Sequence, residues 1–141
     1  MFEKIAKSYG FEKSFGGLFM ESDECIIVLD LQKSNFGNYY DLNIKIFVQG
    51  VFGKAYKKTK DLVKKDVGDI FRRQPDKYKD LFNLDIKIED IERKKVVESF
   101  FDEFIEPFIN NGLSKSGIKY LAKKGEIFLL PAVEKELTRI G

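Results

Sequence analysis

The sequence predicts an α+β fold: an antiparallel sheet of about four strands with helices packed mainly on one face. Three observations support this prediction. Strand patterns occupy the first half of the chain, whereas the longest helical pattern lies in the second half. The two strongest strands are joined by a polar turn that is too short for a parallel crossover. No repeat or linker divides the 141 residues, so we expect a single domain over residues 1–141.

A helix and two strands are expected in the N-terminal region. Apolar side chains recur at helical spacing over residues 2–9, and Gly10 follows as a natural helix end. After the turn glycines of "FGG", the stretch "LFMES" has the pattern of a short strand. The strongest strand runs over residues 25–32, and its aliphatic run favours a central place in the sheet.

A second long strand, over residues 39–49, is expected to pair with the first one in a hairpin. We expect Gln32 to lie opposite Tyr39, which places Asp30 near Asp41. Alternation then assigns the side chains to two faces. The apolar face, expected beneath the long helix, carries Cys25, Ile27, Leu29, Leu31, Tyr40, Leu42, Ile44, Ile46 and Val48. The opposite face carries Ile26, Val28, Asp30, Gln32, Tyr39, Asp41, Asn43, Lys45 and Phe47.

The segment that follows, Lys54 to Asp66, is basic, with six lysines and two aspartates. Its few apolar residues are compatible with a modest helix and with a long mobile loop, and the sequence does not decide between them. Nucleic-acid binding uses aromatic side chains to stack on bases, and only Tyr56 lies here. We therefore favour a solvated lysine-rich surface and expect no nucleic-acid partner. A further strand is expected at "GDIFRR", residues 68–73.

Three helices are expected in the C-terminal half. The helical pattern is clearest between residues 88 and 109, where apolar residues recur with the period of a helix that lies on a sheet. Pro107 lacks a backbone donor and clashes with the preceding turn, so we expect a kink or an early end there. Ser114 or Ser116 is expected to cap a short helix, and Pro131 suits the first position of the last one.

The composition excludes several kinds of chemistry. The chain has no histidine, which excludes Ser-His and Cys-His nucleophile pairs and histidine-ligated zinc. The one cysteine, Cys25, excludes an internal disulfide, and we interpret it as a small buried hydrophobe. No P-loop, dinucleotide-binding glycine turn or nucleophile elbow is present. We predict no catalytic residue, metal site or cofactor, and an enzyme here would depend on carboxylates, Lys, Tyr or a hard metal such as Mg²⁺.

The charge balance and the apolar runs bear on partners and location. The 25 basic and 23 acidic residues give a net charge of +2, which does not favour an anionic membrane or nucleic acid as partner. The N-terminal residues are charged throughout, unlike a signal peptide. No apolar run approaches the ~20 residues that a membrane-spanning helix needs. We therefore expect a cytoplasmic protein without a membrane partner.

The polar face of the hairpin is the candidate functional surface. Asp30 and Asp41 are expected to repel each other unless a cation lies close by. One candidate for that cation is Arg72 or Arg73, because one of these neighbours must point to this face. A ligand cation or a metal is the alternative. A solvated exterior with weak surface ion pairs is the interpretation that we favour. The functional interpretation is a shallow ligand surface formed by Asp30, Gln32, Asn43, Lys45 and an arginine.

The string "LQKSNFGNYYDLNIKIF" resembles the bacterial family called domain of unknown function 4304, and so do "GDIFRRQP", "DLFNLD" and "KGEIFLLPAVEKEL". The resemblance implies a bacterial cytoplasmic protein, and it implies no established activity, cofactor or partner. The residues that match the family pattern and carry polar side chains are Gln32, Lys33, Ser34, Asn43 and Arg72. An alternative is that these residues only determine the turn and the sheet.

The predicted site therefore comprises Asp30, Gln32, Lys33, Ser34, Asn43, Lys45 and Arg72. The expected function is that of a non-enzymatic domain that binds or regulates a protein partner. The alternative is a small-ligand binder or an enzyme that uses the polar face through Asp30, Lys45 and Arg72. The sequence leaves the oligomeric state open.

Overall fold

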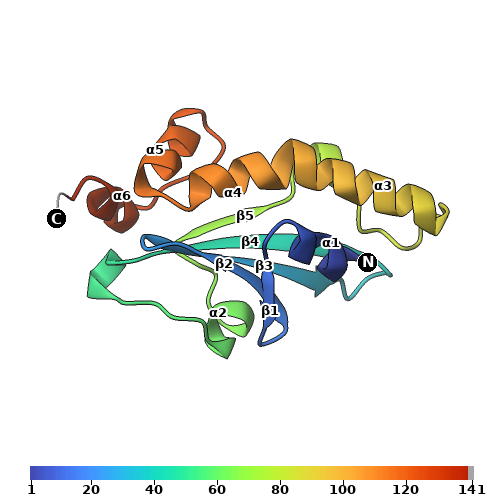
Figure 1. The fold of residues 1–141 in the computed structure, drawn as a ribbon, viewed down its shortest axis with the longest axis horizontal. Coiled ribbons are helices and arrows are strands. Elements are labelled where there is room, and N and C mark those ends of the chain that lie inside the picture. Colours follow the sequence, from blue (N-terminus) through green and yellow to red (C-terminus); the bar gives the residue numbers. More distant parts are fainter. Residues whose placement is uncertain (140–141) are drawn as a thin grey trace.

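The computed structural model describes residues 1–139 and confirms the α+β prediction (Figure 1). Its strands form one antiparallel sheet of five strands in the order β1-β2-β3-β4-β5, so each strand pairs with its neighbours in sequence. The strands are β1 (Glu12–Ser14), β2 (Gly17–Glu21), β3 (Cys25–Lys33), β4 (Tyr40–Val48) and β5 (Ile70–Arg73). The sheet therefore has one strand more than the sequence predicted.

The additional strand is β1, which the sequence patterns do not indicate because its three residues are polar and lie at the sheet edge. It exists because the chain reverses sharply at Phe15 and Gly16, which have φ angles of 52° and 82°. Two consecutive residues with positive φ form the two-residue turn that matches the twist of a hairpin. The predicted "FGG" turn is thus also a strand connection.

Helices cover both faces of the sheet unequally (Figure 1). On one face lie α1 (Phe2–Ser8), α3 (Asp90–Phe100), α4 (Glu106–Gly112), α5 (Lys115–Lys123) and α6 (Pro131–Leu137). On the other face lies α2 (Lys60–Lys64). Two short 3₁₀ turns, η1 (Val51–Gly53) and η2 (Asp76–Tyr78), follow β4 and β5.

The long helix passes through Pro107 instead of ending there. A π-helical turn, η3 (Phe101–Ile105), joins α3 to α4, so the helical path continues to Gly112. Proline has no N–H and its ring clashes with the carbonyl four residues earlier. The carbonyl that Pro107 would clash with is that of Glu103, which lies within the wider π turn, where hydrogen bonds reach one residue farther. Of the two predicted outcomes, a kink or an early end, the chain shows a local irregularity in the form of this turn and no early end.

The two C-terminal helices begin where the sequence predicts. Ser114 caps α5, and its hydroxyl accepts a hydrogen bond of 3.0 Å from the Gly117 N–H. Pro131 occupies the first position of α6, where its missing N–H costs nothing.

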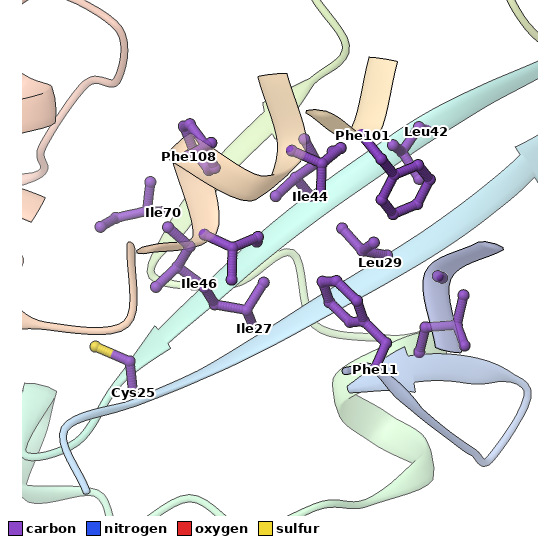
Figure 2. Packing of buried hydrophobic residues seen from close by; sticks show 14 of the residues in the cluster. Phe11, Cys25, Ile27, Leu29, Leu42, Ile44, Ile46, Ile70, Phe101 and Phe108 are labelled. Atoms are coloured by element: carbon purple, nitrogen blue, oxygen red, sulfur yellow. The ribbon is translucent and has the colours of Figure 1, made fainter. Parts of the chain in front are cut away.

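The main core lies between the sheet and the long helix, as predicted. Leu42, Ile44 and Ile46 of β4 are fully buried. Figure 2 shows Phe101 and Phe108 of the long helix above the hairpin side chains. Each such side chain contributes about 1.5–3 kcal/mol when it leaves water. This core therefore holds the sheet and the helix layer together.

A second, smaller core lies beneath α2 on the opposite face. It shows that the basic segment, left open between a helix and a loop, contains a short helix. Residues 54–59 have no regular secondary structure, and α2 then places Leu62 and Val63 against the sheet. The buried members of this core are Phe19, Ile26, Val28, Phe47, Leu62 and Val63, with Tyr56 packed beside them. The helix α2 therefore covers one half of the sheet face that the sequence predicted to be polar.

The pairing of β3 with β4 is shifted by two residues from the predicted pairing. Gln32 pairs with Asp41, and Asp30 pairs with Asn43. Pairing begins at Lys33 of β3 and Tyr40 of β4, and the Ser34 N–H donates to the Tyr39 carbonyl just beyond them. The loop between the strands therefore lies one residue later in the sequence than predicted. The face of each side chain is unchanged, since parity is kept. The predicted opposition of Asp30 and Asp41 was wrong.

Candidate functional site

The half of the second sheet face that α2 leaves uncovered carries a set of polar side chains. We call this region the open end. It receives alternate residues from three adjacent strands, β3, β4 and β5. Four side chains there are linked to one another, and we call them the polar cluster: Gln32, Asp41, Asn43 and Arg73.

Asn43 is the centre of the polar cluster. Its Nδ2 donates to Oε1 of Gln32 at 2.9 Å, and its Oδ1 accepts from Nε of Arg73 at 3.1 Å. Because only 5% of Asn43 is exposed, these two bonds satisfy a buried amide and fix its orientation. The Arg73 Nη1 lies 3.9 Å from Oδ2 of Asp41. This outer pair is largely exposed and contributes little stability, but it orients the guanidinium.

An exposed aromatic ring adjoins the polar cluster. Phe71 of β5 is 43% exposed and points to the same face as Arg73, because the two are separated by one residue. The guanidinium carbon of Arg73 lies 6.0 Å from the centre of the Phe71 ring. The open end therefore combines one aromatic ring, one arginine and fixed amide groups.

Two hollows of the molecule lie elsewhere. One of about 660 Å³ separates α1 from α3, and another of about 640 Å³ lies between η1 and α6. No residue of the polar cluster lines either of them. The open end thus offers side chains on a sheet surface and does not share these hollows.

Lys45 belongs to the same face, but it lies beneath α2 instead of on the open end. It is 5% exposed, and its Nζ donates to the carbonyls of Val63 at 2.7 Å and Leu62 at 3.4 Å. Burial lowers the pKa of the Lys45 ammonium, and the negative charge of Asp30 partly opposes this effect. Lys45 therefore holds the last carbonyls of α2, and its predicted place on a surface was wrong.

Arg72 lies on the other face, which corrects its predicted place in the site. Its guanidinium carbon lies 4.9 Å from the ring centre of Phe104 and 5.7 Å from that of Phe108. Its Nη1 donates to the Glu126 carbonyl at 2.8 Å. Arg72 thus packs on the long helix, and Arg73 takes the position on the polar face.

The remaining predicted residues divide between the turn and the sheet. Ser34 closes the turn, since its hydroxyl accepts from the Phe36 N–H at 3.0 Å. Lys33 is exposed and, by alternation, points to the helix side. Asp30 lies on the polar face, where its charge acts on Lys45. The structure therefore brings together only Gln32 and Asn43 of the predicted set in the hydrogen-bonded cluster, with Asp30 on the same face.

The predicted site lacks Asp41, Phe71 and Arg73, although Arg73 was one of the two arginines considered for this face. The signal that identifies Arg73 and Phe71 is the β4–β5 register, in which they pair with Asn43 and Lys45. The sequence alone does not reveal that register, because Arg72 and Arg73 are both suitable partners for the polar Asn43.

The described residues hold no cluster of metal ligands, and their one cysteine is buried. No group of three or more Cys, Asp or Glu side chains within residues 1–139 is arranged to hold a metal ion. Cys25 is fully buried, and burial raises the pKa of its thiol to about 12. Over the same residues, no helix has the length and apolar character needed to cross a membrane.

Comparisons with known proteins define the family. No curated protein and no solved structure gives a significant match to this chain. The family model described as Domain of unknown function (DUF4304) matches residues 2–111, which include the whole sheet and the helices from α1 to α4 except the last residue of α4. The stretch "LQKSNFGNYYDLNIKIF" lies inside this match, as the resemblance predicted. The chain therefore belongs to the family of the Domain of unknown function (DUF4304).

Proposed function

We propose that this chain is a protein-binding domain that contacts its partner through the open end, by the polar cluster and Phe71. The observation that supports the proposal is the hydrogen-bonded Asn43, which holds Gln32 and Arg73 in place beside an exposed aromatic ring. Arginine and aromatic side chains are enriched at protein interfaces. A preformed network lowers the cost of ordering side chains when a partner binds.

The alternative of a small-ligand binder or an enzyme has less support. It requires Asp30, Lys45 and Arg72 to converge on one site. Lys45 is beneath α2 and Arg72 is on the opposite face, so these three groups do not meet. An extended sheet surface with one ring and one arginine suits a protein partner better than a small molecule.

The proposed setting of this interaction is the bacterial cytoplasm. A single, buried and free cysteine supports this setting, because proteins of reducing compartments rarely carry disulfides. The partner that we propose is a protein whose surface offers hydrogen-bond acceptors to Arg73 and an apolar contact to Phe71.

Site-specific crosslinking in the source cells tests the proposal. Phe71 is replaced by the photoreactive benzoylphenylalanine, and a matched control carries the same residue at Phe128, which is 80% exposed. We expect a crosslinked protein adduct from position 71 that is absent from position 128. Adding R73E should lower the adduct yield by roughly tenfold, as loss of an interface anchor does.

Two outcomes would contradict the proposal. One is the absence of any adduct at position 71 above the level at position 128. The other is an adduct that R73E leaves unchanged, which would show that the polar cluster is not part of the contact.

A further inference from the structure

Arg93 of α3 is a buried cation without an acidic partner. Only 8% of the residue is exposed, and no carboxylate within residues 1–139 forms an ion pair with it. Its guanidinium donates to the carbonyls of Leu81 and Asn83 at 3.3 Å and to that of Ile86 at 2.7 Å. Carbonyl oxygens satisfy hydrogen bonds but do not neutralise the charge. A buried charge of this kind is costly unless an anion joins it.

The guanidinium still has donor capacity. All three bonds come from Nη1 and Nη2, and none comes from Nε. An arginine side chain carries five N–H groups, and the edge that holds Nε and Nη2 fits the two oxygens of a carboxylate. The Nε–H makes none of these bonds, so Arg93 can donate it to an anion without giving up the carbonyls that hold its position.

Arg93 forms part of the wall of a hollow of about 290 Å³ between η2 and α3. Most of the wall is apolar: Leu81, Ile86, Ile88 and Val96 line it, with Tyr78 and the charged rim residues Asp76, Lys77, Lys79 and Asp80. Ile86, Ile88 and Val96 are 42%, 40% and 46% exposed, so they present apolar surface to an entering group. The volume is just below the ~300–1,000 Å³ of pockets for drug-sized ligands. It suits one short chain.

We propose that this hollow is a binding site for a carboxylate carried on a short apolar group, with Arg93 as the anchor. The carboxylate pairs with the Nε–H side of the guanidinium, and the apolar group contacts Ile88 and Val96. A free short-chain carboxylic acid and a glutamate side chain of a protein both offer this chemistry. The site shares no residue with the open end, so the two proposals succeed or fail separately.

The first experiment titrates the folded protein with 4-methylpentanoate and, as the matched neutral control, with 4-methylpentanamide. The resonance of the Arg93 Nε–H and the backbone amides of Ile88 and Val96 are followed by NMR. We expect saturable shifts with the acid and roughly tenfold or more weaker binding of the amide, because the amide lacks the charge-assisted pair. Equal binding of both compounds, or no shift with the acid, overturns the proposal.

A second pair of probes assigns the source of the carboxylate. The blocked dipeptide acetyl-Leu-Glu-amide is compared with acetyl-Leu-Gln-amide and with 4-methylpentanoate in the same titration. Tighter binding of the glutamate peptide than of the free acid assigns the site to a protein partner. Tighter binding of the free acid assigns it to a small molecule. If neither binds, the proposal is wrong.

A variant at Val96 keeps the test independent of folding effects at Arg93. Val96→Glu places a tethered carboxylate beside the hollow, whereas the matched control Asn110→Glu adds the same charge at an exposed position of α4 that does not line the hollow. We expect V96E to abolish the shifts caused by 4-methylpentanoate and N110E to retain them. Loss in both variants, or retention in both, contradicts a site that recognises charge through Arg93.

Discussion

Cys25 illustrates how burial determines the reactivity of a single residue. Its side chain is fully buried, and burial raises the pKa of its thiol to about 12, so the reactive thiolate is scarce at neutral pH. Exposing it requires an opening of the core on the order of 5 kcal/mol or more. We expect a thiol reagent to modify folded Cys25 at least about a thousandfold more slowly than an exposed thiol. The variant C25A/N35C, with its thiol at the exposed Asn35 position, is the control. Equal rates in the two proteins would show that the core is open at Cys25.

Asp69 gives a prediction for the dependence of stability on pH. Its carboxylate accepts from the Val48 N–H at 2.9 Å and from the Tyr56 hydroxyl at 3.0 Å, yet burial dominates and raises the pKa of Asp69 above 3.8. The folded chain therefore binds this proton more tightly than the unfolded chain does. Its stabilising contribution is complete below pH 3.8 and decreases as the pH rises through the raised pKa.

The variant D69N isolates this contribution, because an asparagine does not titrate. We expect the free energy of unfolding of the wild type to decrease relative to that of D69N as the pH rises above 3.8. Urea unfolding at a series of pH values measures it. A difference that stays constant with pH would contradict the raised pKa.

At the residue scale, alternation predicted the face of each hairpin side chain but not its surroundings. Asn43 and Gln32 are where the sequence placed them, because parity survives the shift in register. The burial of Lys45 was not predictable, since the alternation that assigns its face does not reveal that α2 covers it. Arg72 and Arg73 were not distinguishable, because only the pairing of β5 with β4 decides which one shares the face of Asn43.

The position of α2 depends on a glycine in β2. A Cβ added to Gly17 would lie 2.8 Å from Cγ2 of Val63, closer than real Cβ contacts allow. We expect G17A to displace α2 and to cost roughly 1–3 kcal/mol of stability, as overpacking does. In the V63A background the same substitution should cost clearly less, because the clashing methyl groups are absent. The four unfolding free energies form a double-mutant cycle, and a coupling of zero would refute the contact.

At the scale of elements, long patterns were predictive and short ones were not. The hairpin strands and the long helix each repeat their pattern over several turns or alternations, so their type was predicted correctly. β1 has only three polar residues, and pairing across a tight turn creates it. The π turn before Pro107 was expected only as an irregularity, because the sequence does not show how packing distributes the strain.

For the whole molecule, the two cores predict unequal local stability. α2 has five residues, far fewer than the ~12–15 that an isolated helix needs, so it depends on the second core and on Lys45. The amides of Lys65 and Asp66 donate to the Asp61 carbonyl. We expect the free energy of the opening that lets them exchange to be lower by roughly 2 kcal/mol or more than that of the β3 amides. Hydrogen exchange measures this gap, and K45M should widen it. Equal protection of both regions would contradict two separate cores.

The overall architecture was more predictable than the candidate site. The apolar face of the hairpin and the phenylalanine-rich helix specify one layer of packing, and the main core follows from them. The second layer depends on two apolar residues in a lysine-rich segment, which propensity alone does not distinguish from a loop. The location of the open end follows from how far α2 extends, so it was known only once that helix was placed.

The neighbour-to-neighbour strand order has a consequence for co-translational folding on the ribosome. Every strand emerges before α3 does, and each needs only the preceding one to pair, so a meander can assemble while synthesis continues. Its apolar face then stays exposed to solvent until the residues from Asp90 onward appear, since these supply much of its cover. A nascent chain that stalls near Asp90 is thus the form most in need of a chaperone.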